Sequence, residues 1–284
     1  MSFTTLISTA VLDMHLGEPA WIVVDCRFKL DDIFWGKQQY QDAHIPGALY
    51  ADLDRDLSAA KTGKNGRHPL PDSSTLAATF SRFGISDGTQ VIAYDQDSGM
   101  YASRLWWMLR YMGHDAVAVL DGGMAKWTAE ARETDSGVAS GAPAAFTGRP
   151  RRDMLVDATA VASLTGPNVP HSTKLLDARA PQRFRGETEP LDKVAGHIPG
   201  AANHFFQQNL GGAGTFRTPE ELRAQFGTAL GGTPPEDVVC YCGSGVTACH
   251  NLLALEHAGL KGAKLYAGSW SEWCSDERRP VEKG

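Results

Sequence analysis

The feature that most constrains the fold is an internal repeat that relates the two halves of the chain. In each half an apolar run ends in Asp-x-Arg, a His-Ile-Pro-Gly-Ala turn follows, and a second apolar run and a Gly- and Trp-containing segment come later. The paired segments are 25–27 and 177–179, 43–48 and 196–201, 90–95 and 238–242, and 120–127 and 265–273. Because these landmarks recur in one order, they indicate a tandem duplication of one structural unit.

Each half alternates short β-branched runs with segments of helical periodicity. The clearest helical patterns span 74–83, 103–112 and 220–230. Alternation of this kind predicts parallel strands with helices on both faces of the sheet. The fold class expected is therefore α/β, with two tandem domains that are each a parallel sheet flanked by helices.

The boundary between the domains is marked by composition. Residues 134–149 are rich in Ser, Gly, Ala and Pro, which is typical of a linker. We predict an N-terminal domain over 1–137, a linker over 138–150 and a C-terminal domain over 151–284. A chain of 284 residues is long enough for each domain to have its own core.

Charge and apolar content exclude several classes of protein. A hydrophobic fraction of 42% and a charged fraction of 21% are typical of a soluble globular protein. The net charge of −6 argues against nucleic acid as a partner, and no apolar run approaches the roughly 18 residues that span a membrane. Asp13 and His15 interrupt the apolar N-terminal stretch, which argues against a signal peptide. With five cysteines and no disulfide framework, a cytoplasmic location is expected.

The turn that contains Cys242 is the strongest candidate for chemistry. An apolar strand leads into this Gly-rich turn, and a helical pattern begins near Val246. Backbone N–H groups and the dipole at a helix N-terminus favour an anion, so Cys242 is expected to ionise readily and to act as a nucleophile. Glycines would let the turn curl so that its amides converge on the sulfur. The residues expected to bind the sulfur and the donor in this way are Gly243, Gly245, Val246 and Thr247.

The loop CGSGVT, together with its strand and helix, resembles the active-site loop of the rhodanese-type sulfurtransferases. Within that family it is most similar to the mercaptopyruvate sulfurtransferases, because the thiosulfate sulfurtransferases usually carry cations directly after the cysteine. Here those positions are the neutral Gly243 and Ser244, which favours a mercaptopyruvate monoanion over a thiosulfate dianion. The resemblance covers essentially the whole chain.

The resemblance implies a function. A sulfane sulfur would pass from 3-mercaptopyruvate to Cys242, forming a persulfide and releasing pyruvate, and then to cyanide or to a thiol such as thioredoxin or glutathione. No cofactor would take part. Sulfur transfer from thiosulfate to cyanide is the alternative function, and a non-catalytic binding module is the remote one.

The corresponding turn of the first half lacks a cysteine. Asp95 stands where the second half has Cys242, and Asp97 follows. A carboxylate cannot form a persulfide, and two acids would repel an anionic donor, so the N-terminal domain is predicted to be catalytically silent.

The other cysteines are expected to be buried as small apolar side chains. They are Cys26, Cys240, Cys249 and Cys274. Because no second cluster with zinc spacing exists, no metal site is predicted.

The resemblance also implies a relay of side chains beside the nucleophile. In this family the serine two residues after the cysteine has been proposed to work with a histidine and an aspartate from the first domain. Ser244, His68 and Asp54 match that pattern, with Asp52 as the alternative aspartate. Such a relay could polarise the donor carbonyl or move a proton as the pyruvate enolate leaves.

Recognition of a donor carboxylate favours arginine, whose guanidinium matches a carboxylate with two parallel hydrogen bonds. Arg183, in Arg-Phe-Arg-Gly, matches the arginine with which these enzymes bind donor anions. Their second arginine normally follows a Glu-Pro pair, where this chain has Leu191, and Arg185 is expected to substitute for it. Arg27 and Arg179 recur in both halves and are expected to form structural ion pairs.

A phosphatase that uses a cysteine loop is the competing enzyme class. Phosphate chemistry in such a loop needs an arginine at its end. No arginine follows Cys242 within the turn, which argues against this class.

Overall fold

The structure, a computed structural model, describes residues 2–165 and 173–284. The chain folds into two compact units. The first comprises Met1–Ala59, Pro71–Arg151 and Gly212–Phe216, and the second comprises Ala60–Leu70, Arg152–Gly211 and Arg217–Gly284. Each unit thus follows one half of the sequence and also takes one short segment from the other half.

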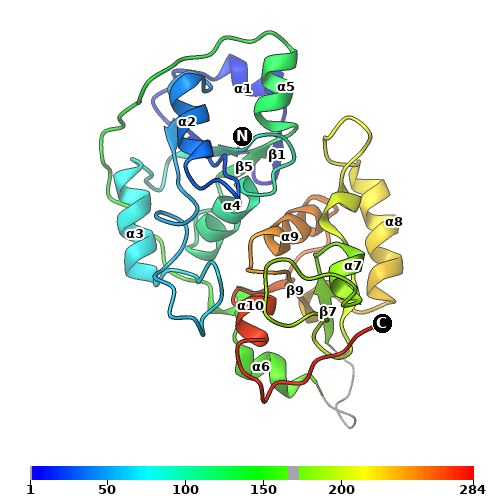
Figure 1. Cartoon of the computed structure of the whole chain (residues 1–284). Coiled ribbons are helices and arrows are strands. Elements are labelled where there is room, and N and C mark those ends of the chain that lie inside the picture. The colour runs from blue at the N-terminus through cyan, green and yellow to red at the C-terminus, as the bar shows by residue number, and fades with distance from the viewer. Residues whose placement is uncertain (1, 166–172) are drawn as a thin grey trace. The chain divides into compact units, whose positions relative to one another are not determined.

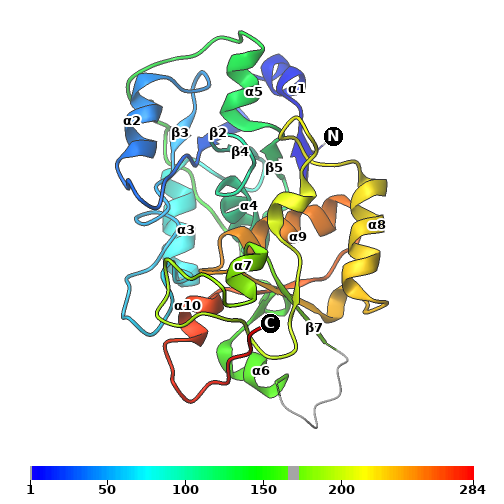
Figure 2. The ribbon, with the colours of Figure 1, turned by 45° about the vertical axis from the view of Figure 1, so that its right-hand side comes forward.

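The first unit is a parallel sheet with helices on both faces (Figure 1). Its elements are β1 (Leu6–Ile7), α1 (Thr9–Met14), β2 (Trp21–Asp25), α2 (Trp35–Asp42), β3 (Leu49–Tyr50), α3 (Ser73–Arg82), β4 (Gln90–Tyr94), α4 (Ala102–Tyr111), β5 (Val117–Leu120) and α5 (Gly123–Ala129). The described strands lie in the order β1-β5-β4-β2-β3, and each neighbouring pair is parallel. In Figures 1 and 2, α1 and α5 lie on one side of the strands and α4 lies on the other.

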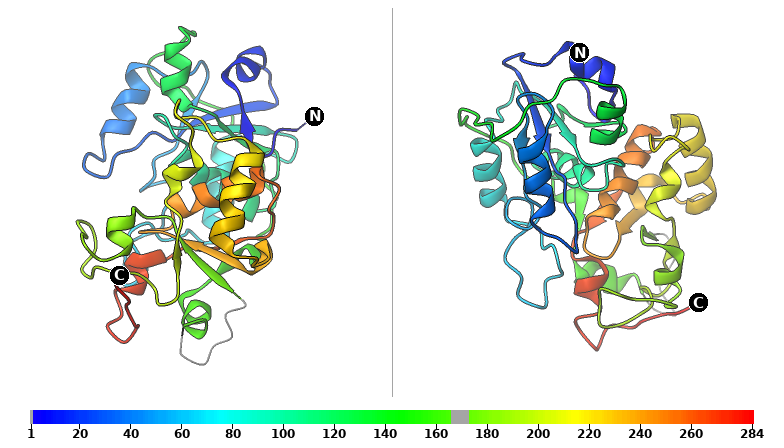
Figure 3. Two further views of the ribbon diagram at one scale, coloured as in Figure 1. Left: turned by 90° about the vertical axis from the view of Figure 1, so that its right-hand side faces the viewer. Right: turned by 45° about the horizontal axis from the view of Figure 1, so that its top comes forward.

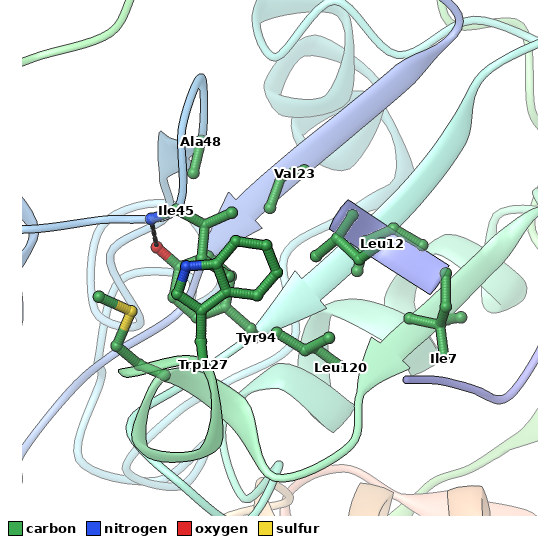
Figure 4. Packing of buried hydrophobic residues seen from close by; sticks show 11 residues of the cluster. Ile7, Leu12, Val23, Ile45, Ala48, Tyr94, Leu120 and Trp127 are labelled. Carbon is green, nitrogen blue, oxygen red and sulfur yellow. Dashed lines mark hydrogen bonds between the residues drawn. The ribbon is translucent and has the colours of Figure 1, made fainter. Parts of the chain in front are cut away.

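The residues of the central strands explain this layering. Every residue of β4 is buried, because helices cover both faces of a parallel sheet. In one of the two layers of side chains, Leu12 of α1, Trp127 of α5 and Tyr94 at the end of β4 belong to a single buried cluster (Figure 4). The hydroxyl of Tyr94 accepts a hydrogen bond of 3.2 Å from the N–H of Ile45, so the His-Ile-Pro-Gly turn is held against the core.

The second unit repeats this architecture. Its strands and α-helices are β6 (Leu155–Val156), α6 (Ala158–Ser163), β7 (Lys174–Asp177), α7 (Pro181–Phe184), β8 (Ala202–Asn203), α8 (Pro219–Leu230), β9 (Val238–Tyr241), α9 (Thr247–His257), β10 (Lys264–Tyr266) and α10 (Ser269–Trp273). Short 3-10 helices span Arg152–Met154, Phe206–Asn209 and Pro235–Asp237. The described strands lie in the order β6-β10-β9-β7-β8, which is the order of the first unit with each strand replaced by its counterpart.

The helices of the second unit also occupy both faces of its sheet. Helices α8 and α9 are in contact and lie together on one side of the strands, with α6 and α10 on the other (Figures 1 and 3). Helix α8 is capped at its N-terminus by Thr218, whose side chain accepts from the N–H of Glu221 in a capping box, and at its C-terminus by Gly231 in a left-handed conformation. The prediction of two tandem α/β domains with parallel sheets is therefore confirmed.

None of the helices in the two described ranges combines the length and the apolar character that a membrane crossing requires.

Candidate active site

Cys242 lies at the carboxyl end of β9, in the middle of the second sheet. The strand ends at Tyr241, and α9 begins at Thr247, so the intervening turn connects a central strand to a helix N-terminus. In open α/β sheets, ligands bind at the carboxyl ends of the strands. The side chain of Cys242 is 2% exposed. This is the strand–turn–helix arrangement that the sequence predicts.

The turn directs a backbone amide at the sulfur. The N–H of Gly245 points to Sγ of Cys242 at an N–S distance of 3.1 Å. Gly245 has a φ of +76°, which a residue with a side chain rarely adopts, so the curl of the turn requires glycine here. This hydrogen bond strengthens as negative charge gathers on the sulfur, so it supports a thiolate or a persulfide.

Two residues at the start of α10 form hydrogen bonds with the cysteine turn. The N–H of Cys242 donates to Oγ of Ser269 over 3.1 Å, and the N–H of Ser271 donates to the carbonyl of Gly243 over 2.9 Å. Ser269 is buried and has a φ of +55°, close to the +54° of its counterpart in the first unit, Gly123. The sequence analysis does not identify Ser269, although its alignment with a glycine in the repeat is a signal that could have found it.

The equivalent turn of the first unit binds a carboxylate of its own. Asp95 is 1% exposed, and its side chain accepts hydrogen bonds of 2.7 to 3.2 Å from the backbone amides of the turn. These donors are the N–H groups of Asp97, Gly99, Tyr101 and Ala102. Burial raises the pKa of Asp95, while these hydrogen bonds act in the opposite direction. The turn of this fold is therefore an anion cradle, and in the first unit Asp95 fills it.

Removing this carboxylate is expected to destabilise the first unit. In Asp95→Ala the amides of the turn lose their acceptor, and a buried donor left unsatisfied costs about 1–3 kcal/mol. Chemical denaturation should show a lower free energy of unfolding, with sulfur transfer per folded molecule unchanged. Asp97→Ala is the matched control, because Asp97 is exposed. Equal losses in the two variants would contradict the cradle role of Asp95.

The structure brings together two of the residues predicted for the relay. Nδ1 of His68 lies 2.7 Å from Oγ of Ser244, and both side chains are buried. His68 comes from the first half of the sequence, but its segment, Ala60–Leu70, belongs to the second unit. A serine–histidine pair therefore stands two residues from the predicted nucleophile.

The two candidate aspartates of the relay belong to the first unit. Oδ1 of Asp52 accepts from the N–H groups of Asp54 and Arg55 at 2.9 and 3.1 Å, so this carboxylate closes its own turn. The choice between Asp54 and Asp52 as the aspartate of the relay stays a prediction.

Two guanidinium groups lie beside the cysteine loop. A methyl group added to Gly243 would lie 2.8 Å from Nη2 of Arg67 and 3.5 Å from Nη2 of Arg183. Arg183 also binds Glu189, through Nε at 3.1 Å and Nη2 at 2.7 Å. Arg183 is the arginine predicted for the donor, whereas the sequence analysis does not identify Arg67. In the sequence, the only feature that points to Arg67 is its position directly before His68.

Arg185 does not join this group in the structure. Its guanidinium pairs with Glu187, and both side chains are exposed. Leu191, where the family carries an arginine, is 44% exposed. The second cation beside Gly243 is therefore Arg67, and the expectation that Arg185 substitutes for the missing arginine receives no support from these contacts.

The ion pairs predicted for the repeated Asp-x-Arg motif are present in both units. Arg27 binds the carboxylate of Asp25, and Arg179 binds that of Asp177, each through Nε and Nη2. The four side chains are buried, so each pair anchors its strand end.

The remaining cysteines lack the environment of Cys242. Burial raises the pKa of Cys26, Cys240 and Cys274, so each favours the neutral thiol. Cys249 is fully buried, and its Sγ donates to the carbonyl of Gly245 at 3.3 Å. Within residues 2–165 and 173–284, no group of three or more His, Cys, Asp or Glu side chains could hold a metal ion.

Comparisons with known proteins agree with this geometry. The model of the rhodanese-like domain matches residues 8–130 and 159–276. A protein of Pseudomonas aeruginosa named "Probable 3-mercaptopyruvate sulfurtransferase" is 49% identical over 287 residues, covering all of both chains. The thiosulfate sulfurtransferase of Cricetulus griseus is 34% identical over 277 residues, covering 95% of this chain and 90% of that protein.

A solved structure gives the same result. The 3-mercaptopyruvate sulfurtransferase of Leishmania major superposes with a TM-score of 0.85 at 31% identity, covering 98% of this chain and 76% of that one. Both halves of the sequence therefore match one domain family, the second half with its cysteine turn intact. The chain belongs to the rhodanese family, as a sulfurtransferase with two rhodanese-like domains in tandem.

Proposed function

We propose that this protein is a 3-mercaptopyruvate sulfurtransferase that carries the transferred sulfur as a persulfide on Cys242. The observation that carries the proposal is the cysteine turn itself, where the N–H of Gly245 meets Sγ and the Ser244–His68 pair stands alongside. The relatives named for this activity include the human 3-mercaptopyruvate sulfurtransferase, 36% identical over 241 residues, which cover 84% of this chain and 79% of that protein.

The first half-reaction moves sulfur from the donor to the enzyme. The thiolate of Cys242 attacks the sulfur of 3-mercaptopyruvate, an S–S bond forms, and the bond between that sulfur and C3 breaks. The bonding pair passes to the carbon, giving the enolate of pyruvate, which takes a proton at C3. The amide of Gly245 stabilises the charge on the sulfur of Cys242.

The role of the Ser244–His68 pair is to stabilise the negative charge that develops on the carbonyl oxygen of the donor. The 2.7 Å contact fixes the hydroxyl of Ser244, which donates to the carbonyl oxygen as negative charge develops there. Asp54 is the aspartate that we propose as the third member of this relay.

The second half-reaction regenerates the enzyme. A thiolate acceptor attacks the outer sulfur of the persulfide, a new S–S bond forms on the acceptor, and Cys242 leaves as the thiolate. Thioredoxin or glutathione fills this role in a reduced cytoplasm, and cyanide replaces them in an assay. The five cysteines are all free, which supports that location.

The proposed division of the chain assigns catalysis to one domain. The catalytic domain spans 151–284, and a linker over 138–150 joins it to a catalytically silent domain over 1–137.

The donor is tested by comparing 3-mercaptopyruvate and thiosulfate in steady state, with cyanide as the common acceptor. We expect a higher kcat/KM with 3-mercaptopyruvate. Ser244→Ala should lower the 3-mercaptopyruvate reaction by about 10²-fold or more, and the thiosulfate reaction less, because only the former donor has a carbonyl to polarise. A higher efficiency with thiosulfate in the unmodified protein would instead identify the thiosulfate sulfurtransferase.

A further inference from the structure

Arg67 reaches the active-site turn from a segment more than a hundred residues away in the sequence. The N–H of Arg67 donates to Oγ of Ser271 over 3.0 Å. A methyl group on the preceding Gly66, which has a φ of +87°, would lie 2.9 Å from the carbonyl oxygen of Gly268. The backbone of Arg67 is therefore seated on the segment whose Ser271 N–H holds the carbonyl of Gly243.

A single carboxylate joins Arg67 to Arg183. Asp192 accepts from Nη1 of Arg67 through one oxygen and from Nη2 of Arg183, at 3.3 Å, through the other. The side chain of Asp192 is 5% exposed, and its backbone N–H donates to Glu189. The shared carboxylate of Asp192 therefore fixes the two guanidinium groups relative to each other.

In each of the two guanidinium groups, a nitrogen that does not bind Asp192 lies beside the cysteine turn. A methyl group on Gly243 would lie 2.8 Å from Nη2 of Arg67 and 3.6 Å from Nη1 of Arg183. Within the described part of the chain, neither of these two nitrogens donates a hydrogen bond. Two donors are thus available beside the residue that follows the nucleophile.

The charges of this group are balanced without a donor. The cations Arg67, Arg179 and Arg183 are matched by the carboxylates of Asp177, Glu189 and Asp192, all of them mostly buried. A donor with one negative charge disturbs that balance less than a donor with two, because each charge interacts with the nearby carboxylates in a partly desolvated site.

We propose that Arg67 and Arg183 together bind the donor carboxylate, and that Asp192 orients both guanidinium groups and selects a monoanionic 2-oxo acid over a dianion. The inference rests on the proposed function and assigns the specificity of the same site. Arg67 supplies the second cation, and Asp192 limits the net positive charge.

Steady-state kinetics of Arg67→Ala, Arg67→Lys and Asp192→Asn with both donors tests this assignment. Arg67→Ala should raise KM for 3-mercaptopyruvate about tenfold or more with kcat little changed, and Arg67→Lys should recover part of the loss. Asp192→Asn should raise kcat/KM for thiosulfate relative to 3-mercaptopyruvate by about tenfold. Arg278→Ala, at an arginine whose side chain is 89% exposed in the same unit, is the control and should change neither ratio.

Thermal unfolding and the rate of Cys242 alkylation show whether each variant retains its fold and its turn. An unchanged KM in a folded Arg67→Ala protein overturns the role of Arg67. Equal losses with both donors in Asp192→Asn overturn the selective role of Asp192. The donor preference of the unmodified protein distinguishes failure of the proposed function from failure of this inference. If the unmodified protein prefers thiosulfate, the proposed function is contradicted. If it prefers 3-mercaptopyruvate but the variants lack the effects given above, only the inference is contradicted.

Discussion

Replacing Cys242 with serine is expected to abolish sulfur transfer from any donor to any acceptor. A serine hydroxyl stays protonated at neutral pH and cannot form the S–S bond of a persulfide, so the first half-reaction has no nucleophile. The measurement is the steady-state rate with 3-mercaptopyruvate and cyanide. The unfolding midpoint should barely change, because serine is close to cysteine in size and its hydroxyl oxygen can accept the hydrogen bond that the N–H of Gly245 donates to Sγ.

Alanine at Cys249 or Cys274 provides the comparison. Cys249 is buried within α9, and burial raises the pKa of Cys274, so neither is suited to attack a donor. Both variants should keep most of the activity. Substantial turnover by Cys242→Ser, or its loss in a folded Cys274→Ala protein, would contradict the assignment of the nucleophile.

Replacing Arg183 with alanine should raise KM for 3-mercaptopyruvate about 10- to 100-fold. A hydrogen bond between charged groups contributes roughly 1.5–3 kcal/mol, and about 1.4 kcal/mol corresponds to a factor of ten. Glu189 loses Arg183 but keeps Nη1 of Arg179 at 3.3 Å, so the loop should stay folded. The measurement is the steady-state KM for 3-mercaptopyruvate of Arg183→Ala, compared with that of the unmodified protein.

Arg185→Ala tests whether Arg185, as expected from the sequence, or Arg67, as the contacts in the structure indicate, helps to bind the donor. Arg185 pairs with the exposed Glu187, so its removal should leave KM nearly unchanged. If Arg185→Ala weakens donor binding as much as Arg183→Ala, the donor carboxylate binds at Arg185, and the assignment to Arg67 fails.

The fold could be predicted because its signals are local and repeated. Buried parallel strands such as β4 are continuous apolar runs, and the repeat shows twice where each strand ends. The strand order follows from tertiary pairing and has no local signal. The same holds for residues 60–70 and 212–216, each of which folds with the other half of the chain.

The site could be predicted only where the chemistry lies in one loop or in a recognisable motif. The cysteine turn is local, so its own residues lead to Gly245, and the family resemblance leads to the Ser244–His68 pair. Arg67 and Asp192 come together only through folding, since they lie 125 positions apart, so the sequence analysis does not identify Arg67 beside Gly243. The turn itself is neutral, as the sequence shows, yet the guanidinium groups of Arg67 and Arg183 lie next to it.

The most direct test of the account is the mass of the protein after it meets its donor. The full-length chain is treated with 3-mercaptopyruvate without an acceptor, and the intact protein and its peptides are weighed. The account predicts the added mass of one sulfur atom, located on the peptide that contains Cys242, lost on addition of cyanide, and absent from Cys242→Ser. Sulfur located on another cysteine, or no added mass in a protein that still turns over, would contradict it.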